Sequence, residues 1–266
     1  MLANYHTHTT FCDGKNTAEE MVLQAIEFGF SALGFSGHGF TSEDDTYCMQ
    51  KPLEYIAEIK RLKQKYADKI QIYVGVEEDS REWVNRADYD YIIGSTHYVL
   101  KDGKYFSVDH SHEYFLNALK HFDGDYMAYA KNYFDRHVSY ILKRKPDIIG
   151  HFDLITKFDE LDKSIYLENK EYNLMAENYL LQALKAQSIF EVNTGAIARS
   201  LRTTPYPAVN LLHLIKKNDG KVMITTDCHM KERLSASINE TRLLLKDIGF
   251  NCVYVLYDNE YQKDYL

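Results

Sequence analysis

Residues that can bind metal ions follow one apolar segment after another along this chain. Six such segments end in a histidine or an acidic residue, and the residues are His6 and His8, His38, Glu77, His97, His151, and Asp227 with His229. One such coincidence would mean little. Six of them in chain order place the side chains at the same end of many parallel strands, which is where α/β barrels build their active sites.

The two ends of the chain carry the closest-spaced candidates. His6-Thr7-His8 is a pair whose alternate side chains point the same way in an extended segment, so both imidazoles can reach one metal ion. Asp13 follows five residues later, and Asp227-Cys228-His229 repeats the spacing near the other end. Imidazole and carboxylate ligands together are typical of zinc, iron or manganese rather than calcium. The pattern therefore predicts a multinuclear metal centre.

Helical and strand-like segments alternate from one end of the chain to the other. Amphipathic periodicity predicts helices over residues 18–28, 53–66, 125–143, 169–186, 209–216 and 233–248. Thr17 is the expected N-cap of the first helix and Gly29 its stop. The intervening strands read as continuous apolar runs, as parallel strands covered on both faces do. Seven or eight such βα units predict an α/β barrel, with residues 98–112 as a polar loop over the site.

Composition limits the classes of function. The chain has 266 residues and a formal net charge of −8, which argues against a broad nucleic-acid surface. Its four cysteines are scattered and lack the spacing of a zinc finger or a disulfide framework, which favours a reduced, cytoplasmic environment. No signal peptide or membrane span is expected. We expect one domain over residues 1–266, and no obligate protein partner is indicated.

These motifs resemble the polymerase and histidinol phosphatase (PHP) family of metal-dependent phosphoesterases. The resemblance covers nearly the whole chain and runs through His6-Thr7-His8, Asp13, Ser36-Gly37-His38, Gly75-Val76-Glu77, Ser95-Thr96-His97, Gly150-His151-Phe152-Asp153 and Thr226-Asp227-Cys228-His229. It implies an irregular seven-stranded α/β barrel of the (β/α)7 type, with two to three divalent metal ions at the C-terminal ends of the strands.

Carried over residue by residue, the resemblance implies three metal positions. The first would be held by His6, His8, Glu77 and Asp227. Glu77 would bridge to a second position, completed by His97 and His151, and the third would be held by Asp13, His38 and His229. A hydroxide between the metals is then the expected nucleophile, because metal ions lower the pKa of bound water to about 7.

Three further residues are candidates for contacting the phosphate or the leaving group. Arg199 and Arg202 follow the strand that ends at Asn193, and their guanidinium groups match phosphate geometry. We expect Arg199 to be the better phosphate ligand, the alternative being an ordinary surface arginine. Asp153 is a candidate proton donor, or else a residue that orients His151.

The substrate is an expectation from resemblance. The size of the chain, its Gly-His-x-Asp segment and the absence of an attached polymerase region are most like stand-alone histidinol-phosphate phosphatases. Hydrolysis of L-histidinol phosphate in histidine biosynthesis is therefore expected, and the acidic run at residues 43–45 is a candidate contact for a cationic part of the substrate. The alternatives are a PHP phosphoesterase for another small phosphate ester (a nucleotide, an oligonucleotide end or phosphotyrosine) and a non-catalytic metal-binding barrel.

Several histidines receive a plainer interpretation. His110 and His112 form a second pair with one residue between them, but they lie in the polar stretch and are expected in a solvated loop. His121, His137 and His213 fall within helical patterns and are expected at the surface or in packing contacts.

Overall fold

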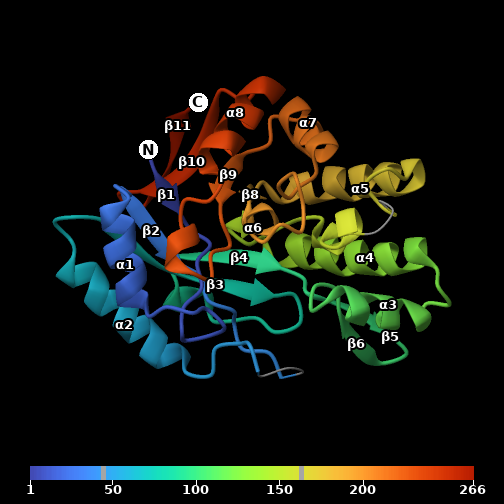
Figure 1. Cartoon of the computed structure of the whole chain (residues 1–266), viewed down its shortest axis with the longest axis horizontal. Helices are drawn as coiled ribbons and strands as arrows, with labels where there is room; N and C mark the ends of the chain where they lie inside the picture. The colour runs from blue at the N-terminus through green and yellow to red at the C-terminus, as the bar shows by residue number, and fades with distance from the viewer. Residues whose placement is uncertain (43–45, 162–164) are drawn as a thin grey trace.

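Seven parallel strands form the central sheet of the computed structural model, which describes residues 1–42, 46–161 and 165–266. Neighbouring strands follow chain order: β1 (Ala3–Asn4), β2 (Ala32–Phe35), β3 (Gln71–Asp79), β4 (Tyr91–Ser95), β7 (Ile148–Ile149), β8 (Ile189–Asn193) and β9 (Val222–Thr225). The two outer strands approach each other beyond their ladders, where Thr7 forms a parallel bridge with Cys228. The sheet is therefore a nearly closed barrel, which confirms the predicted fold class (Figure 1).

Helices surround the strands. They are α1 (Ala18–Glu27), α2 (Pro52–Lys65), α3 (His112–Lys120), α4 (Tyr126–Arg144), α5 (Lys170–Ala183), α6 (Gly195–Ala198), α7 (Val209–Lys217) and α8 (Ile238–Ile248). In Figure 1, α1 and α2 cover one side of the barrel and α4 and α5 the opposite side. Short 3-10 turns lie at Arg86–Asp88, Leu154–Thr156, Asp159–Leu161, Leu184–Ala186 and Lys231–Arg233. Within the described residues, every helix is too short or too polar to span a membrane.

The predicted boundaries of α1 are confirmed by its end groups. The Thr17 hydroxyl accepts a hydrogen bond from the Glu20 backbone N–H, and the Glu20 carboxylate accepts one from the Thr17 N–H. This reciprocal pair satisfies two N–H groups that the first turn of a helix leaves unpaired. At the other end Gly29 has a φ of +77°, a left-handed conformation that glycine adopts without steric cost.

The long helix α4 explains part of the tyrosine content. Tyr129, Tyr133 and Tyr140 are buried against the barrel, and Tyr126 is partly buried. These residues recur at helical spacing, and their side chains form one apolar face. His137 is fully buried on the same helix, as expected for a packing residue, whereas His213 on α7 is exposed.

The structure corrects two predicted segments. The stretch expected to be a loop contains an antiparallel hairpin, β5 (Tyr98–Lys101) and β6 (Lys104–Ser107), whose turn residues Asp102 and Gly103 have positive φ. Helix α3 then begins at His112, capped by the Ser111 hydroxyl. Helix α8 begins at Ile238 rather than at residue 233, because Ser237 adopts a left-handed conformation with φ of +57°.

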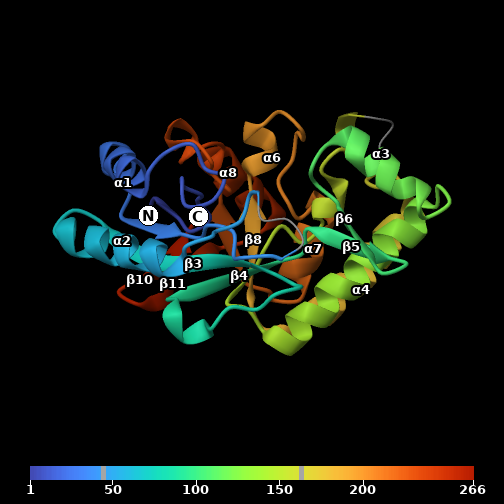
Figure 2. The ribbon, with the colours of Figure 1, turned by 90° about the horizontal axis from the view of Figure 1, so that it is seen from below.

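The last predicted strand lies outside the barrel wall. It forms β10 (Cys252–Tyr257), which pairs antiparallel with β11 (Glu260–Tyr265). Val255 and Leu256 of β10 belong to an apolar cluster with Tyr5 and with the first residues of several barrel strands, among them Ala32 and Ile148. The Tyr5 hydroxyl also donates a hydrogen bond of 2.6 Å to the Leu256 carbonyl. This hairpin therefore closes the end of the barrel opposite to the candidate metal ligands (Figure 2).

Candidate metal centre

Alternation along the strands places the candidate ligands. Tyr73 on β3 and Ile93 on β4 lie in the apolar cluster inside the barrel. Glu77 and His97 stand four residues further along each chain segment, and successive side chains of a strand point to opposite faces, so both are directed to the same interior at its C-terminal end. His38 joins them because it forms a parallel bridge with Glu77 beyond β2.

The first predicted group of ligands is brought together. His6 Nε2 lies 3.2 Å from Glu77 Oε2 and 3.6 Å from Asp227 Oδ1. His8 Nε2 lies 3.6 Å and 3.2 Å from the same two oxygens. Zinc held by nitrogen and oxygen at about 2.0–2.1 Å in a tetrahedron has ligand atoms about 3.3 Å apart. The four side chains therefore have the spacing that a single metal ion requires.

The second predicted group gathers on the other oxygen of Glu77. His151 Nε2 lies 2.9 Å and His97 Nε2 3.3 Å from Glu77 Oε1. One carboxylate thus faces two sets of imidazoles, each through a different oxygen. This is the arrangement that a bridging glutamate between two metal ions needs.

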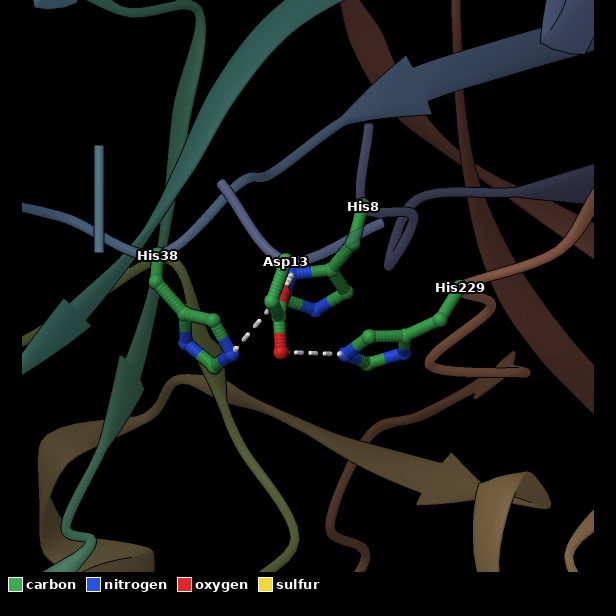
Figure 3. A group of neighbouring side chains, drawn as sticks. All are labelled: His8, Asp13, His38 and His229. Carbon is green, nitrogen blue, oxygen red and sulfur yellow. Dashed lines mark ion pairs between the residues drawn. The ribbon is translucent and has the colours of Figure 1, made fainter. Parts of the chain in front are cut away.

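The third predicted group surrounds Asp13 (Figure 3). His229 Nε2 lies 3.2 Å from Asp13 Oδ2, and His38 Nε2 lies 3.7 Å from Asp13 Oδ1. Two additional contacts were not expected from the sequence. His8 presents its Nδ1 to Asp13 Oδ1 at 3.5 Å, and His38 presents its Nδ1 to Glu77 Oε2 at 2.9 Å, so both imidazoles connect the neighbouring groups.

The buried polar atoms of the centre fit a cation. His6 Nε2, His8 Nε2, Glu77 Oε2 and Asp13 Oδ1 have no hydrogen-bond partner among the described residues. A buried polar atom without a partner costs about 1–3 kcal/mol. Several such atoms converging on common points are explained if divalent metal ions complete their bonding, and the donor set of nitrogen and oxygen suits zinc, iron or manganese.

The charges of the centre are strongly coupled in the absence of metal. Burial opposes ionisation of Glu77, but the surrounding imidazoles, His6 first among them, lower its pKa well below the ordinary value. Burial would lower the pKa of His97, but chiefly the Glu77 charge raises it to about 10. Burial and the neighbouring imidazoles lower the pKa of His8 to about 3. Metal binding must therefore displace protons from some of these histidines, because only neutral imidazole is a ligand.

A cavity of about 370 Å³ opens over the candidate ligands. Besides seven of the predicted ligands from the three groups, its wall includes Tyr47, Tyr98, Ser107, Asp109, His110, Lys157 and Arg199. His110 is exposed in the bend between β6 and α3, which confirms the expectation of a solvated loop, and it also lines the cavity. The hairpin β5–β6 and the segment after it form this part of the wall, so residues 98–112 do cover the site as predicted, but as an ordered structure.

The predicted phosphate and proton-transfer residues have different surroundings. Arg199 lies on the cavity wall and donates from its guanidinium to Asp227 Oδ2 at 2.9 Å. Arg202 is only 3% exposed and donates to the Thr156 hydroxyl at 2.6 Å, behind the wall. Asp153 is fully buried, its Oδ2 accepts from the Ala208 N–H at 3.0 Å, and burial raises its pKa. The geometry thus supports a phosphate contact for Arg199 and gives no such support for Arg202 or for proton donation by Asp153.

Two carboxylates were not identified from the sequence. Glu191 on β8 accepts a hydrogen bond from His6 Nδ1 at 2.8 Å, and Asp79 on β3 accepts one from His97 Nδ1 at 3.1 Å. The sequence contains a feature that could have identified each of them. Glu191 is a lone charge inside the apolar run Ile189-Phe190-Glu191-Val192, and Asp79 stands two residues after Glu77 on the same face of β3.

Other candidates stay outside the three groups. Cys12 Sγ lies 3.5 Å from His8 Nδ1, and the Cys228 thiol donates to the Met230 carbonyl, so neither joins a set of candidate ligands among the described residues. The acidic run at residues 43–45 lies outside the described residues.

Comparisons with known proteins agree with this architecture. The model of the PHP domain matches residues 4–195. A probable histidinol-phosphatase of Schizosaccharomyces pombe is 26% identical, covering 96% of this chain and 90% of its own. The histidinol-phosphatase of Lactococcus lactis is 28% identical, covering 93% and 91%.

Two solved structures share the fold. A putative histidinol phosphatase from Listeria monocytogenes superposes with a TM-score of 0.76 at 22% identity, over 90% of this chain and 99% of its own. The histidinol phosphate phosphatase of Lactococcus lactis was solved with zinc, L-histidinol and phosphate. It superposes with a TM-score of 0.70 at 22% identity, over 98% of this chain and 99% of its own. The match of the family model over most of the chain and the barrel with its converging ligands lead to one conclusion: the chain belongs to the PHP-domain family.

Proposed function

We propose that this protein is a metal-dependent phosphomonoesterase that hydrolyses L-histidinol phosphate to L-histidinol and phosphate, a step of histidine biosynthesis. The observation that carries the proposal is the position of Glu77 between two sets of imidazoles, each facing a different carboxylate oxygen. The choice of substrate is supported by the relatives, which are named histidinol-phosphatases and are matched over about nine tenths of their length.

The proposed centre holds two to three divalent ions, with the ligands grouped as the resemblance to the PHP family implies. The first position uses His6, His8, Glu77 and Asp227, the second uses Glu77, His97 and His151, and the third uses Asp13, His38 and His229. Zinc is the favoured ion because the donor spacing suits it and because the Lactococcus lactis structure contains it.

Ions in these positions would supply an activated water and positive charge that stabilises the phosphoryl group in the transition state. The protein's own contribution is to hold these charges and to orient the ester. Arg199 is placed on the cavity wall to donate to a phosphate oxygen, in exchange for its contact with Asp227. Glu77 and Asp227 fix the charges of the centre, and the buried surroundings strengthen every electrostatic contact within it.

Other residues of the cavity wall offer partners for the remainder of the substrate. Asp109 is negatively charged, and its pKa is lowered chiefly by Lys157, against the effect of burial. Ser107 and Tyr47 add hydroxyl groups to the same wall. Histidinol phosphate carries an amine and an imidazole, which can donate hydrogen bonds to acidic and hydroxyl side chains. A phosphate ester with an uncharged leaving group would use these partners less well.

We also propose that the whole chain acts as one domain in the cytoplasm on this small substrate. Support comes from the bridge between Thr7 and Cys228, which joins the two ends of the chain in one barrel, and from the four cysteines, which are free.

The test is the ratio kcat/KM for L-histidinol phosphate beside AMP, phosphotyrosine and p-nitrophenyl phosphate, with the zinc content of the protein measured in each preparation. We expect a preference for L-histidinol phosphate of about a hundredfold or more, which is about 2.7 kcal/mol of differential transition-state stabilisation. Similar kcat/KM values for all four esters would be consistent with a phosphoesterase but would reject L-histidinol phosphate as its specific substrate. Tight zinc binding without turnover of any ester would reject catalysis.

A further inference from the structure

Glu191 is a fully buried acid in the floor of the candidate metal centre. It lies on β8 between Ile189, which belongs to the apolar cluster inside the barrel, and Asn193. It is in none of the groups whose atoms converge as metal ligands. A buried carboxylate is costly unless its oxygens are satisfied by several donors, so its surroundings should reveal its role.

Four groups surround the Glu191 carboxylate, and all of them can donate. Oε2 accepts from His6 Nδ1 and from the Thr225 hydroxyl, each at 2.8 Å. Oε1 accepts from the Asn193 amide at 3.0 Å and, in a shorter bond, from the His151 backbone N–H. An ionised carboxylate can only accept, so both of its oxygens are fully used.

The contact with His6 decides which ring nitrogen carries the proton. Because Glu191 accepts, His6 Nδ1 must be the donor, and a neutral ring then has its lone pair on Nε2. That Nε2 is the buried atom without a hydrogen-bond partner that faces Glu77 and Asp227. The orientation and the tautomer of His6 therefore agree with a role as a ligand at the first metal position.

We propose that Glu191 is the positioning residue of the metal centre. Through one oxygen it holds His6 in the tautomer that binds the first ion, and through the other it holds the backbone of His151, a ligand of the second. One side chain thus aligns ligands of two metal positions. The inference rests on the proposed function, since it requires that these positions bind metal.

The requirement is for a carboxylate and not only for a side chain of that shape. A glutamine at this position would bring an N–H₂ group against two of the four donors, either His6 and Thr225 or Asn193 and His151. One pair would lose its acceptor whichever way the amide turned. Glu191→Gln therefore disturbs a ligand of at least one metal position while changing almost no volume.

The first experiment uses the wild-type protein. Nitrogen-15 NMR of the zinc-loaded protein, with the His6 resonances assigned by comparison with His6→Gln, reports which ring nitrogen is protonated. We expect Nδ1 to carry the proton and Nε2 to show the shift of a zinc-bound nitrogen. Zinc on Nδ1, or a proton on Nε2, would overturn the proposal.

The second experiment measures zinc affinity by competition with a chromophoric chelator. We expect Glu191→Gln to bind its weakest-held zinc about ten- to a hundredfold less tightly than the wild type. The matched control is Asp159→Asn, which removes another buried carboxylate that accepts from two backbone N–H groups, those of Tyr166 and Leu167. This control should lower the melting temperature and leave zinc affinity unchanged.

The possible results distinguish failure of the proposed function from failure of the role proposed for Glu191. A wild type that binds no zinc would reject the proposed function and this inference together. A folded Glu191→Gln variant with wild-type zinc affinity would reject the inference alone. If the variant does not fold, the tautomer of His6 in the wild type decides.

Discussion

Glu77 and Glu78 are neighbours on β3 whose side chains point to opposite faces of the barrel wall. Glu77 faces the candidate metal ligands, whereas Glu78 accepts from Arg144 Nε at 2.8 Å and from the Tyr140 hydroxyl at 2.7 Å on the outer side. Both are buried. The pair therefore offers a comparison in which the same chemical change is made on two sides of one strand.

We expect Glu77→Gln to lower kcat about a thousandfold, or about 4 kcal/mol, because the bridge between two metal positions loses its charge. Zinc content, measured by atomic absorption, should fall below that of the wild type. Glu78→Gln should instead cost about 3 kcal/mol of stability, since it removes the charge of a fully buried carboxylate that pairs with the partly buried Arg144. Loss of zinc from the Glu78 variant, with full retention in the Glu77 variant, would contradict this assignment.

Residue types and spacing predicted which side chains come together but not all their contacts. Eight of the nine predicted ligands follow apolar runs, and the strands bring them together, whereas Asp13 lies in the turn after His8. The double contacts of His8 and His38 depend on ring orientation, which the sequence does not encode locally. Arg202 lies only three residues after Arg199, yet the turn after α6 buries it behind the wall. The spacing of two residues in a turn, unlike their spacing in a strand, does not determine on which side their side chains lie.

At the scale of elements, end groups were more informative than periodicity. Helix α1 has a complete capping box, and its predicted start is confirmed. Helix α8 has the expected apolar period, but a left-handed Ser237 delays its start. Helix α3 is short, and residues before it form a hairpin whose turn, Asp102-Gly103, is a recognised sequence signal. Because that stretch is polar, its two short strands, β5 and β6, were predicted as a loop.

The cap of α1 allows a direct test at this scale. Thr17→Ala should lower the free energy of unfolding by about 1 kcal/mol, because the first turn loses an acceptor for its N–H groups. Thr17→Ser keeps the hydroxyl and should restore most of the stability. Urea denaturation of the three proteins measures the difference, and an alanine variant as stable as the wild type would show that the cap contributes nothing.

At the scale of the whole molecule, burial of His137 links stability to pH. Burial, reinforced by the charges of His151 and His97, lowers its pKa to about 3, and its Nδ1 lies 3.1 Å from the Thr96 hydroxyl. In the unfolded chain this histidine has an ordinary pKa near 6.5. Unfolding therefore takes up a proton below that pH, and the stability that is present above pH 6.5 is lost as the pH falls toward 3.

We expect His137→Asn to remove about 1.4 kcal/mol per pH unit from the pH dependence of unfolding between pH 6 and 4. The measurement is urea denaturation of the metal-free proteins at several pH values in that interval. His213→Asn is the control, because His213 is exposed and its loss should leave the wild-type slope. Parallel curves for the wild type and the His137 variant would refute the linkage.

The junction between Thr7 and Cys228 has a consequence for how the protein is made. His6 and His8 are synthesised before their partners Asp227 and His229, which are separated from them by more than two hundred residues of chain. Contacts of such long sequence separation form late and slowly. A growing chain therefore exposes this pair of imidazoles long before it can complete the first proposed metal position, so metal binding there must wait until Asp227 has been synthesised.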